Sequence, residues 1–288
     1  MLVLMGDSQT TLLYNALVSQ CEPTHHNFSR MWPFPAEACG LVCNRTYPLP
    51  VCHWESRLGK SGHFHVTREA CADAISRRNP YLEIGDAAAC LTLVGLTRHD
   101  DVLVVNSGLH HNADPNRTLT SSVTRLATWH RNAVKQQQAP CMLWMETLPQ
   151  HFDSWDGRYI APSSSEAPTN VTDKEGLYSQ WPSNGNEVDP RCQCRPLDVA
   201  RDQNGHHQRF NDISSPLISQ AGISMIHVYS LLVQRWDLHL GCRMIGNRTR
   251  KDCTHYRPEA YESLAAKVLS TVDKTCLWER KLASNSAS

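Results

Sequence analysis

The feature that most constrains the fold of this chain is a set of short apolar runs that stop abruptly at small or polar residues. The first run, residues 2–5, ends at the tripeptide Gly6-Asp7-Ser8. Comparable runs lie at residues 101–106, 141–145 and 222–229. A continuous apolar stretch of this length is typical of a strand that is buried on both faces of a parallel sheet.

Helical patterns accompany these runs. Apolar residues recur at helical spacing over residues 10–18 and 120–137. Pro258 opens a third such stretch, and proline is favoured at the first position of a helix. The chain has 288 residues, enough for one large domain and marginal for two. We therefore predict a single α/β domain over residues 1–288, with three α/β/α layers and a flavodoxin-like parallel sheet.

Two long stretches lack this periodicity. Residues 21–65 are rich in Cys, Pro, His and Trp, which favours loops tied by disulfides with one strand among them. Residues 153–215 are polar and hold few apolar anchors. A segment of that length without periodicity is either a functional lid or a partly disordered insertion.

Charge and hydropathy exclude some partners. The chain carries 28 basic and 28 acidic residues, so no net field attracts nucleic acid or an anionic membrane surface. No apolar run approaches the ~18 residues that span a bilayer, and no basic and apolar leader is visible at the start. We expect no nucleic-acid partner, and membrane association only through an N-terminal anchor upstream of this sequence.

Cysteines and glycosylation sequons point to the secretory pathway. The chain has 12 cysteines, an even number that favours disulfides formed in an oxidising compartment. Five sequons begin at Asn27, Asn44, Asn116, Asn170 and Asn247. We predict a glycoprotein of the Golgi lumen or the extracellular space, with a targeting segment preceding the first strand. The alternative is a cytosolic protein with reduced cysteines.

Ser8 is the candidate nucleophile. A serine hydroxyl attacks an acyl group only with a base in reach, a group that orients the base, and donors for the oxyanion. Ser8 follows the first predicted strand and begins the first predicted helix, where its N–H would face a developing negative charge. The alternative is a turn in which Ser8 caps the helix.

Asp252 and His255 are the candidate partners of Ser8. Two positions separate them, which lets the carboxylate hold one ring nitrogen while the other faces the serine. They precede the helix that Pro258 opens, and a strand candidate lies upstream. The alternative is an ordinary surface loop in which Asp252 accepts main-chain hydrogen bonds.

Other candidates follow the second and third predicted strands. Asn106 and Gly108 are candidates for the oxyanion hole, because a glycine lets the backbone approach a ligand and an amide donates. His110 and His151 are candidates for substrate binding; for His151 the alternative is a structural histidine beside the core. Paired histidines and close cysteine pairs give no metal-site spacing, so we expect no metal.

Together these residues resemble the trichome birefringence-like/PC-esterase proteins, a branch of the SGNH/GDSL superfamily that includes plant polysaccharide O-acetyltransferases. The animal sialic-acid O-acetyltransferases are similar. The resemblance rests on Gly-Asp-Ser8, Asn106-Ser-Gly108, Pro149-Gln-His151-Phe152, Leu231 to His239, and Asp252-Cys-Thr-His255. The sequence departs from the family at Leu109-His110, where His-Trp is common, and at Tyr256, where Trp is usual.

The resemblance implies an SGNH-type fold and acyl transfer through Ser8, His255 and Asp252. It also implies an acetyl donor as co-substrate, without a bound cofactor, and a glycan or polysaccharide as acceptor. The implied activity is O-acetyl transfer to glycan hydroxyls. The alternatives are an acetylesterase of the GDSL type acting on carbohydrate and a catalytically inactive glycan-binding protein.

Overall fold

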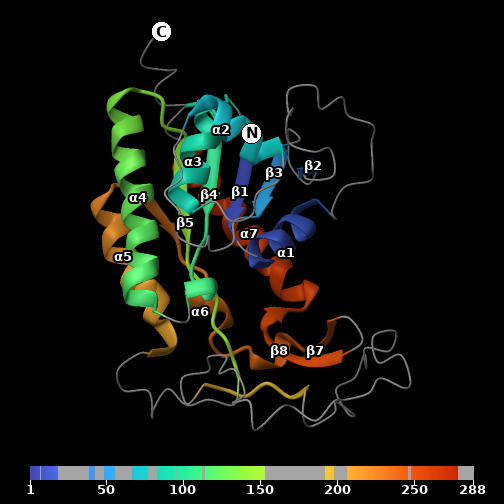
Figure 1. Cartoon of the computed structure of the whole chain (residues 1–288). Helices are drawn as coiled ribbons and strands as arrows, with labels where there is room; N and C mark the ends of the chain where they lie inside the picture. Colours follow the sequence, from blue (N-terminus) through green and yellow to red (C-terminus); the bar gives the residue numbers. More distant parts are fainter. Residues whose placement is uncertain are drawn as a thin grey trace. The chain divides into compact units, whose positions relative to one another are not determined.

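The computed structural model of the protein describes residues 1–6, 8–18, 39–42, 49–55, 67–76, 83–95, 97–111, 114–152, 192–197, 206–245 and 248–277 (Figure 1). The chain forms two compact units, each made of separate segments. We name Met1–Thr147, Phe210–Val228 and Tyr261–Ser288 the sheet unit, and Leu148–Arg209 and Tyr229–Ala260 the hairpin unit. The sequence predicted a single domain over residues 1–288.

The sheet unit is built on a six-stranded sheet among the described residues. Its strands are β1 (Leu2–Gly6), β2 (Cys39–Val42), β3 (Leu49–Glu55), β4 (Val102–Val105), β5 (Cys141–Met145) and β6 (Ser224–Ile226). The spatial order is β2-β3-β1-β4-β5-β6, and all neighbours pair in parallel except the antiparallel edge strand β2. Counted along the chain, the parallel strands follow the order 2-1-3-4-5, a common order of doubly wound sheets.

Both faces of this sheet are buried. Alternate residues of β1 and β4, such as Val3 and Leu103, belong to a core that includes residues of α2 (Arg68–Ser76), α3 (Ile84–Leu93) and α4 (Pro115–Lys135). Their chain neighbours Leu4 and Val104 point to the other face and are 0% exposed. In Figure 1, α4 and α5 (Arg209–Gln220) lie on one side of the strands, and α1 (Ser8–Val18) lies on the other. The fold is thus mixed α/β with a mainly parallel sheet, as predicted.

Two disulfides whose side chains are both described brace the sheet unit. Cys71–Cys90 joins α2 to α3 across a separation of 19 residues. Cys141–Cys276 joins the first residue of β5 to the turn after α7 (Pro258–Val272), across 135 residues. With two further bonds in the hairpin unit, four disulfides lie between described residues, which confirms the predicted disulfide bonding and fits an oxidising environment.

The hairpin unit contains an antiparallel pair, β7 (His239–Ile245) and β8 (Arg248–Tyr256), and a short helix, α6 (Tyr229–Leu232). Cys192–Cys242 and Cys194–Cys253 tie residues 192–197 to the two strands. Gly241 adopts a φ of 77°, and a Cβ there would lie 2.8 Å from the Cys192 carbonyl oxygen. Position 241 therefore requires glycine, because residues 192–197 pack directly against the hairpin there.

Several elements differ from the sequence predictions. The chain between residues 21 and 65 contributes two strands, β2 and β3, rather than one. Part of the predicted lid is helical, because α5 begins at Arg209; most of residues 153–215 lies outside the described residues. α4 begins at Pro115, five residues before the predicted start, because the Asp114 side chain accepts a hydrogen bond from Arg117 N–H and Pro115 opens the helix.

None of the described helices is both long enough and apolar enough to cross a membrane.

Candidate functional site

The carboxyl edge of the parallel sheet carries the first group of candidate residues. Ser8 is the first residue of α1 and is half-buried, and Gly6 is the last residue of β1. A Cβ on Gly6 would lie 2.8 Å from the Asn106 carbonyl oxygen, so the end of β1 packs directly against the segment that follows β4. This edge is where ligands bind in open α/β sheets. Asp7 lies outside the described residues.

Asn106 holds three strand ends together. Its main-chain N–H donates to the Met5 carbonyl at 2.9 Å. Its Nδ2 group donates to the carbonyls of Met145 at 3.0 Å and Glu146 at 3.2 Å, and the residue is wholly buried. In this arrangement the side-chain amide of Asn106 shapes the edge of the sheet, and its oxyanion role stays a prediction.

Gly108 lies in close contact with Thr147. A Cβ on Gly108 would overlap the Thr147 side chain, whose Oγ1 donates to the Ser107 carbonyl at 3.1 Å. Thr147 is itself fixed by Asn211 of α5, which accepts from its N–H at 2.8 Å and donates to its carbonyl at 3.0 Å. Glycine at position 108 therefore lets the loop between β4 and α4 pack directly against Thr147, two residues beyond the end of β5.

A serine–histidine pair, Ser107 and His111, lies beside Gly108, and the sequence analysis missed it. Thr118 Oγ1 donates to the Asp114 carbonyl at 2.7 Å, so at the 2.9 Å contact with His111 it accepts from Nδ1–H. His111 Nε2 is then the acceptor for the Ser107 hydroxyl at 3.1 Å.

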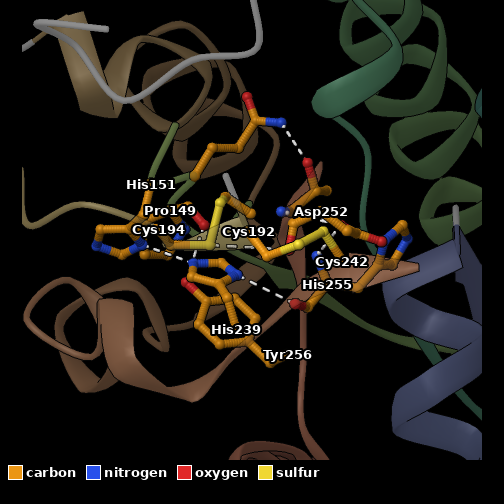
Figure 2. The surroundings of a disulfide bond; sticks show 12 residues. Pro149, His151, Cys192, Cys194, His239, Cys242, Asp252, His255 and Tyr256 are labelled. Carbon is orange, nitrogen blue, oxygen red and sulfur yellow. Dashed lines mark hydrogen bonds and ion pairs between the residues drawn. A yellow bond between two sulfur atoms is a disulfide. The ribbon is translucent and has the colours of Figure 1, made fainter. Parts of the chain in front are cut away.

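The hairpin unit holds the acid–base pair that the sequence predicted. His255 Nδ1 donates to Asp252 at 2.8 Å from Oδ2 and 3.0 Å from Oδ1 (Figure 2). Asp252 Oδ1 also accepts from the main-chain N–H groups of Thr254 at 3.1 Å and His255 at 3.0 Å. The carboxylate thus fixes both the ring and the backbone of His255. Nδ1 carries the proton, which leaves Nε2 as the basic nitrogen.

A bulge makes the three-residue spacing work. Asp252 and His255 lie on strand β8, just before the last helix, and not in the surface loop of the alternative interpretation. Residues three apart on a regular strand point to opposite faces. Here Asp252 pairs with Gly241 and Tyr256 pairs with His239, so the register shifts and the strand turns His255 back toward Asp252.

The charge state of Asp252 follows from its surroundings. Burial by itself would raise the pKa of this carboxyl, but the His255 ring and the main-chain N–H groups of His255 and Thr254 outweigh it and lower the pKa. Asp252 is therefore a carboxylate at neutral pH. It can stabilise an imidazolium at His255, as a general base requires.

Two further histidines lie behind His255. His151 Nδ1 lies 2.7 Å from His239 Nε2, and His239 Nδ1 lies 3.1 Å from the His255 carbonyl oxygen (Figure 2). The His239 ring stacks on Tyr256 with centroids 3.9 Å apart, and the Tyr256 hydroxyl donates to the Pro149 carbonyl at 2.8 Å. His151 is wholly buried in this network, and its role in substrate binding stays a prediction.

The structure therefore brings the predicted residues together as two groups. Ser8, Asn106 and Gly108 belong to the sheet unit, whereas His151, Asp252 and His255 belong to the hairpin unit. His110 lies in a short 3-10 helix, Leu109–His111. Of the sequon residues, Asn116 is exposed in the first turn of α4, and Asn27, Asn44, Asn170 and Asn247 lie outside the described residues.

Sequence reasoning did not assign roles to His239 or Tyr256. The only signal was the match of Leu231 to His239 with a family segment, which gives order along the chain but no partner. Across the described ranges, no group of three or more His, Cys, Asp or Glu is placed to hold a metal ion. No known family model matches the chain, and no curated protein is significantly similar to it.

Proposed function

We propose that this protein is a serine acyl-transfer enzyme in which His255 is the general base, Asp252 its carboxylate partner and Ser8 the nucleophile. The observation that carries the proposal is the Asp252–His255 pair, with ring and backbone of the histidine both held by one carboxylate. A base oriented by a third group is the signature of nucleophilic serine catalysis.

The proposed reaction has two steps. His255 Nε2 takes the proton of the Ser8 hydroxyl as Oγ attacks the carbonyl carbon of an acyl ester or thioester, and Asp252 stabilises the imidazolium. The tetrahedral intermediate collapses, His255 returns the proton to the leaving group, and the acyl group stays on Ser8. An acceptor hydroxyl, deprotonated by His255, then attacks the acyl-enzyme, and His255 passes that proton to Ser8 Oγ as the new ester leaves.

The position of Ser8 supports its role as nucleophile. Its N–H lies at the start of an 11-residue helix, where the helix dipole favours a developing oxyanion. The Gly108 backbone belongs to the same edge of the sheet, and Asn106 packs against the end of β1. We propose that Gly108, with Asn106 shaping the loop, completes the oxyanion hole.

The resemblance in sequence extends the proposal to the substrate. An SGNH-type enzyme of the trichome birefringence-like/PC-esterase kind would transfer an acetyl group to a glycan hydroxyl within the secretory pathway. The disulfides between described residues are consistent with that compartment. An acetylesterase would use the same residues, with water as the acceptor of the acyl group. A glycan-binding protein would bind the sugar without any acyl transfer.

The decisive experiment measures hydrolysis of p-nitrophenyl acetate by wild type, Ser8→Ala and Ser107→Ala. We expect Ser8→Ala to lower kcat/KM by about 10³-fold or more, because the nucleophile is gone. Ser107→Ala is the matched control, since Ser107 also touches a histidine, and we expect it to change the rate less than about threefold. The reverse pattern would identify Ser107 as the nucleophile, and equal rates in all three proteins would favour the binding alternative.

A second experiment separates a transferase from an esterase. The enzyme is incubated with an acetyl donor and a set of oligosaccharide acceptors, and the sugars are examined by mass spectrometry. A mass increase of one acetyl group on an acceptor, abolished in Ser8→Ala, supports transfer. Release of acetate without an acetylated sugar identifies an esterase.

A further inference from the structure

We propose that His239 is a positioning residue for His255, and that it acts as one half of a proton-sharing pair with His151. The inference rests on the proposed function, because positioning matters only if His255 is the base. His239 is the first residue of β7, and the rings of His239 and His151 lie side by side with centroids 4.8 Å apart (Figure 2).

Three short contacts run through the pair. His239 Nδ1 lies 3.1 Å from the His255 carbonyl oxygen, and His151 Nε2 lies 3.0 Å from the Val233 carbonyl oxygen. The remaining two nitrogens, His151 Nδ1 and His239 Nε2, lie 2.7 Å from each other. A carbonyl oxygen only accepts, so each of the first two contacts needs a proton on the ring nitrogen.

When both rings are neutral, His151 and His239 carry too few protons to form all three hydrogen bonds. Two neutral imidazoles carry two N–H groups, and the two carbonyls use both of them. The nitrogens that face each other at 2.7 Å would then both present lone pairs. A third proton would complete all three hydrogen bonds and would make the pair a buried cation.

The surroundings disfavour that third proton. His151 is wholly buried and His239 is 2% exposed. Burial, and next the His151 ring, lower the pKa of His239 to about 3, although its bond to the His255 carbonyl and the Asp252 charge oppose this. Burial also lowers the pKa of His151, against the Val233 bond and the Asp237 charge, while His207 lowers it further. At neutral pH the pair holds two protons and gives up one of its three hydrogen bonds.

The position of the proton on the His239 ring therefore decides whether His239 is hydrogen-bonded to the His255 carbonyl or donates to His151. With Nδ1 protonated, His239 donates to the His255 carbonyl and accepts from His151 Nδ1–H. The hydrogen bond from His151 Nε2 to the Val233 carbonyl is then lost. With Nε2 protonated, His239 donates to His151 and releases His255. We infer that the first state is the working one, because it retains the bond to the proposed general base.

That bond matters because of where His255 lies. The backbone of His255 is in the bulge of β8, with its N–H held by Asp252 at 3.0 Å and its carbonyl by His239 at 3.1 Å. Without the hydrogen bond from His239, the carbonyl of His255 is no longer fixed in the bulge. The His239 ring itself stays in place, because it stacks on Tyr256. A displacement of about 1 Å at a reacting group costs on the order of 10²-fold in rate.

Two substitutions of His239 separate the two nitrogens. His239→Asn places an amide near the Nδ1 position and keeps a donor for the His255 carbonyl, whereas His239→Gln reaches the Nε2 position and keeps only the His151 contact. On p-nitrophenyl acetate we expect His239→Gln to lower kcat about 10- to 100-fold with KM within about twofold. We expect His239→Asn to stay within about threefold of wild type. His130→Gln, at another buried histidine, is the control for an unspecific loss of stability.

Equal losses in kcat for the Asn and Gln variants, or a loss confined to KM, would overturn the inference. A second readout does not depend on activity: ¹⁵N spectra of histidine-labelled wild type at pH 7 report which His239 nitrogen carries the proton. A proton on Nδ1 is expected, and a proton on Nε2 overturns the inference. Wild type that shows the Nδ1 tautomer but hydrolyses no ester in any condition contradicts the proposed function alone.

Discussion

At the scale of single residues, one carboxylate organises the proposed base. Asp252 accepts from the ring of His255 and from two main-chain N–H groups within the same bulge. We expect Asp252→Asn to lower kcat on p-nitrophenyl acetate by about 10³- to 10⁴-fold, because an amide can donate to Nδ1 and select the wrong tautomer. Stopped-flow or steady-state rates at pH 7 measure it; a loss under tenfold would contradict the assigned role.

The same residue predicts a pH dependence of stability. Its folded-state pKa is lowered, so Asp252 contributes stability above its unfolded pKa of about 3.9, and that contribution is lost as pH falls through the folded value. In urea unfolding from pH 7 to pH 2.5, wild type should exceed Asp252→Asn by a constant margin above about pH 5. The margin should shrink below pH 4. A margin that instead grows on acidification has the wrong sign for this explanation.

At the scale of elements, the packing of the loop after β4 gives a test of the sheet edge. Gly108→Ala introduces a Cβ into the space of the Thr147 side chain, and overpacking of this kind costs about 1–3 kcal/mol. We expect Thr147→Ala, made in the same chain, to recover part of that loss. Chemical denaturation of the four proteins of the cycle measures the coupling, and strict additivity would show that the two residues do not compete for space.

The elements also show how far the sequence could lead. β1, β4 and β5 were predicted because their sequences are continuously apolar, as expected of strands that are buried on both faces of a sheet. The one strand expected within residues 21–65 was not located, because Pro50, His53 and Glu55 interrupt the apolar pattern of β3, although β3 pairs with β1. The Asp252–His255 pair was found from spacing, but the bulge that makes the spacing work and the His239 contact depend on pairing with β7, which lies beyond local sequence.

At the scale of the whole molecule, the chain relies on long covalent links. In the chain-entropy model a disulfide that closes a longer loop stabilises more, from about 3 kcal/mol for ~15 residues to about 4.7 kcal/mol for ~100. Cys141–Cys276 closes 135 residues and Cys71–Cys90 closes 19. We expect the paired Cys→Ala variant of the first bond to lower Tm more than that of the second in calorimetry. An equal or reversed order would show that local strain outweighs loop length.

The bond between Cys194 and Cys253 has a consequence for where such a protein can be made active. Cys253 lies between Asp252 and His255 in the bulge, so the bridge fastens the stretch that aligns the proposed acid and base. A chain kept reduced would carry Ser8, Asp252 and His255 without that alignment. Under the proposed function, turnover would begin only after this bond has formed, so an oxidising expression host is the right one for testing activity.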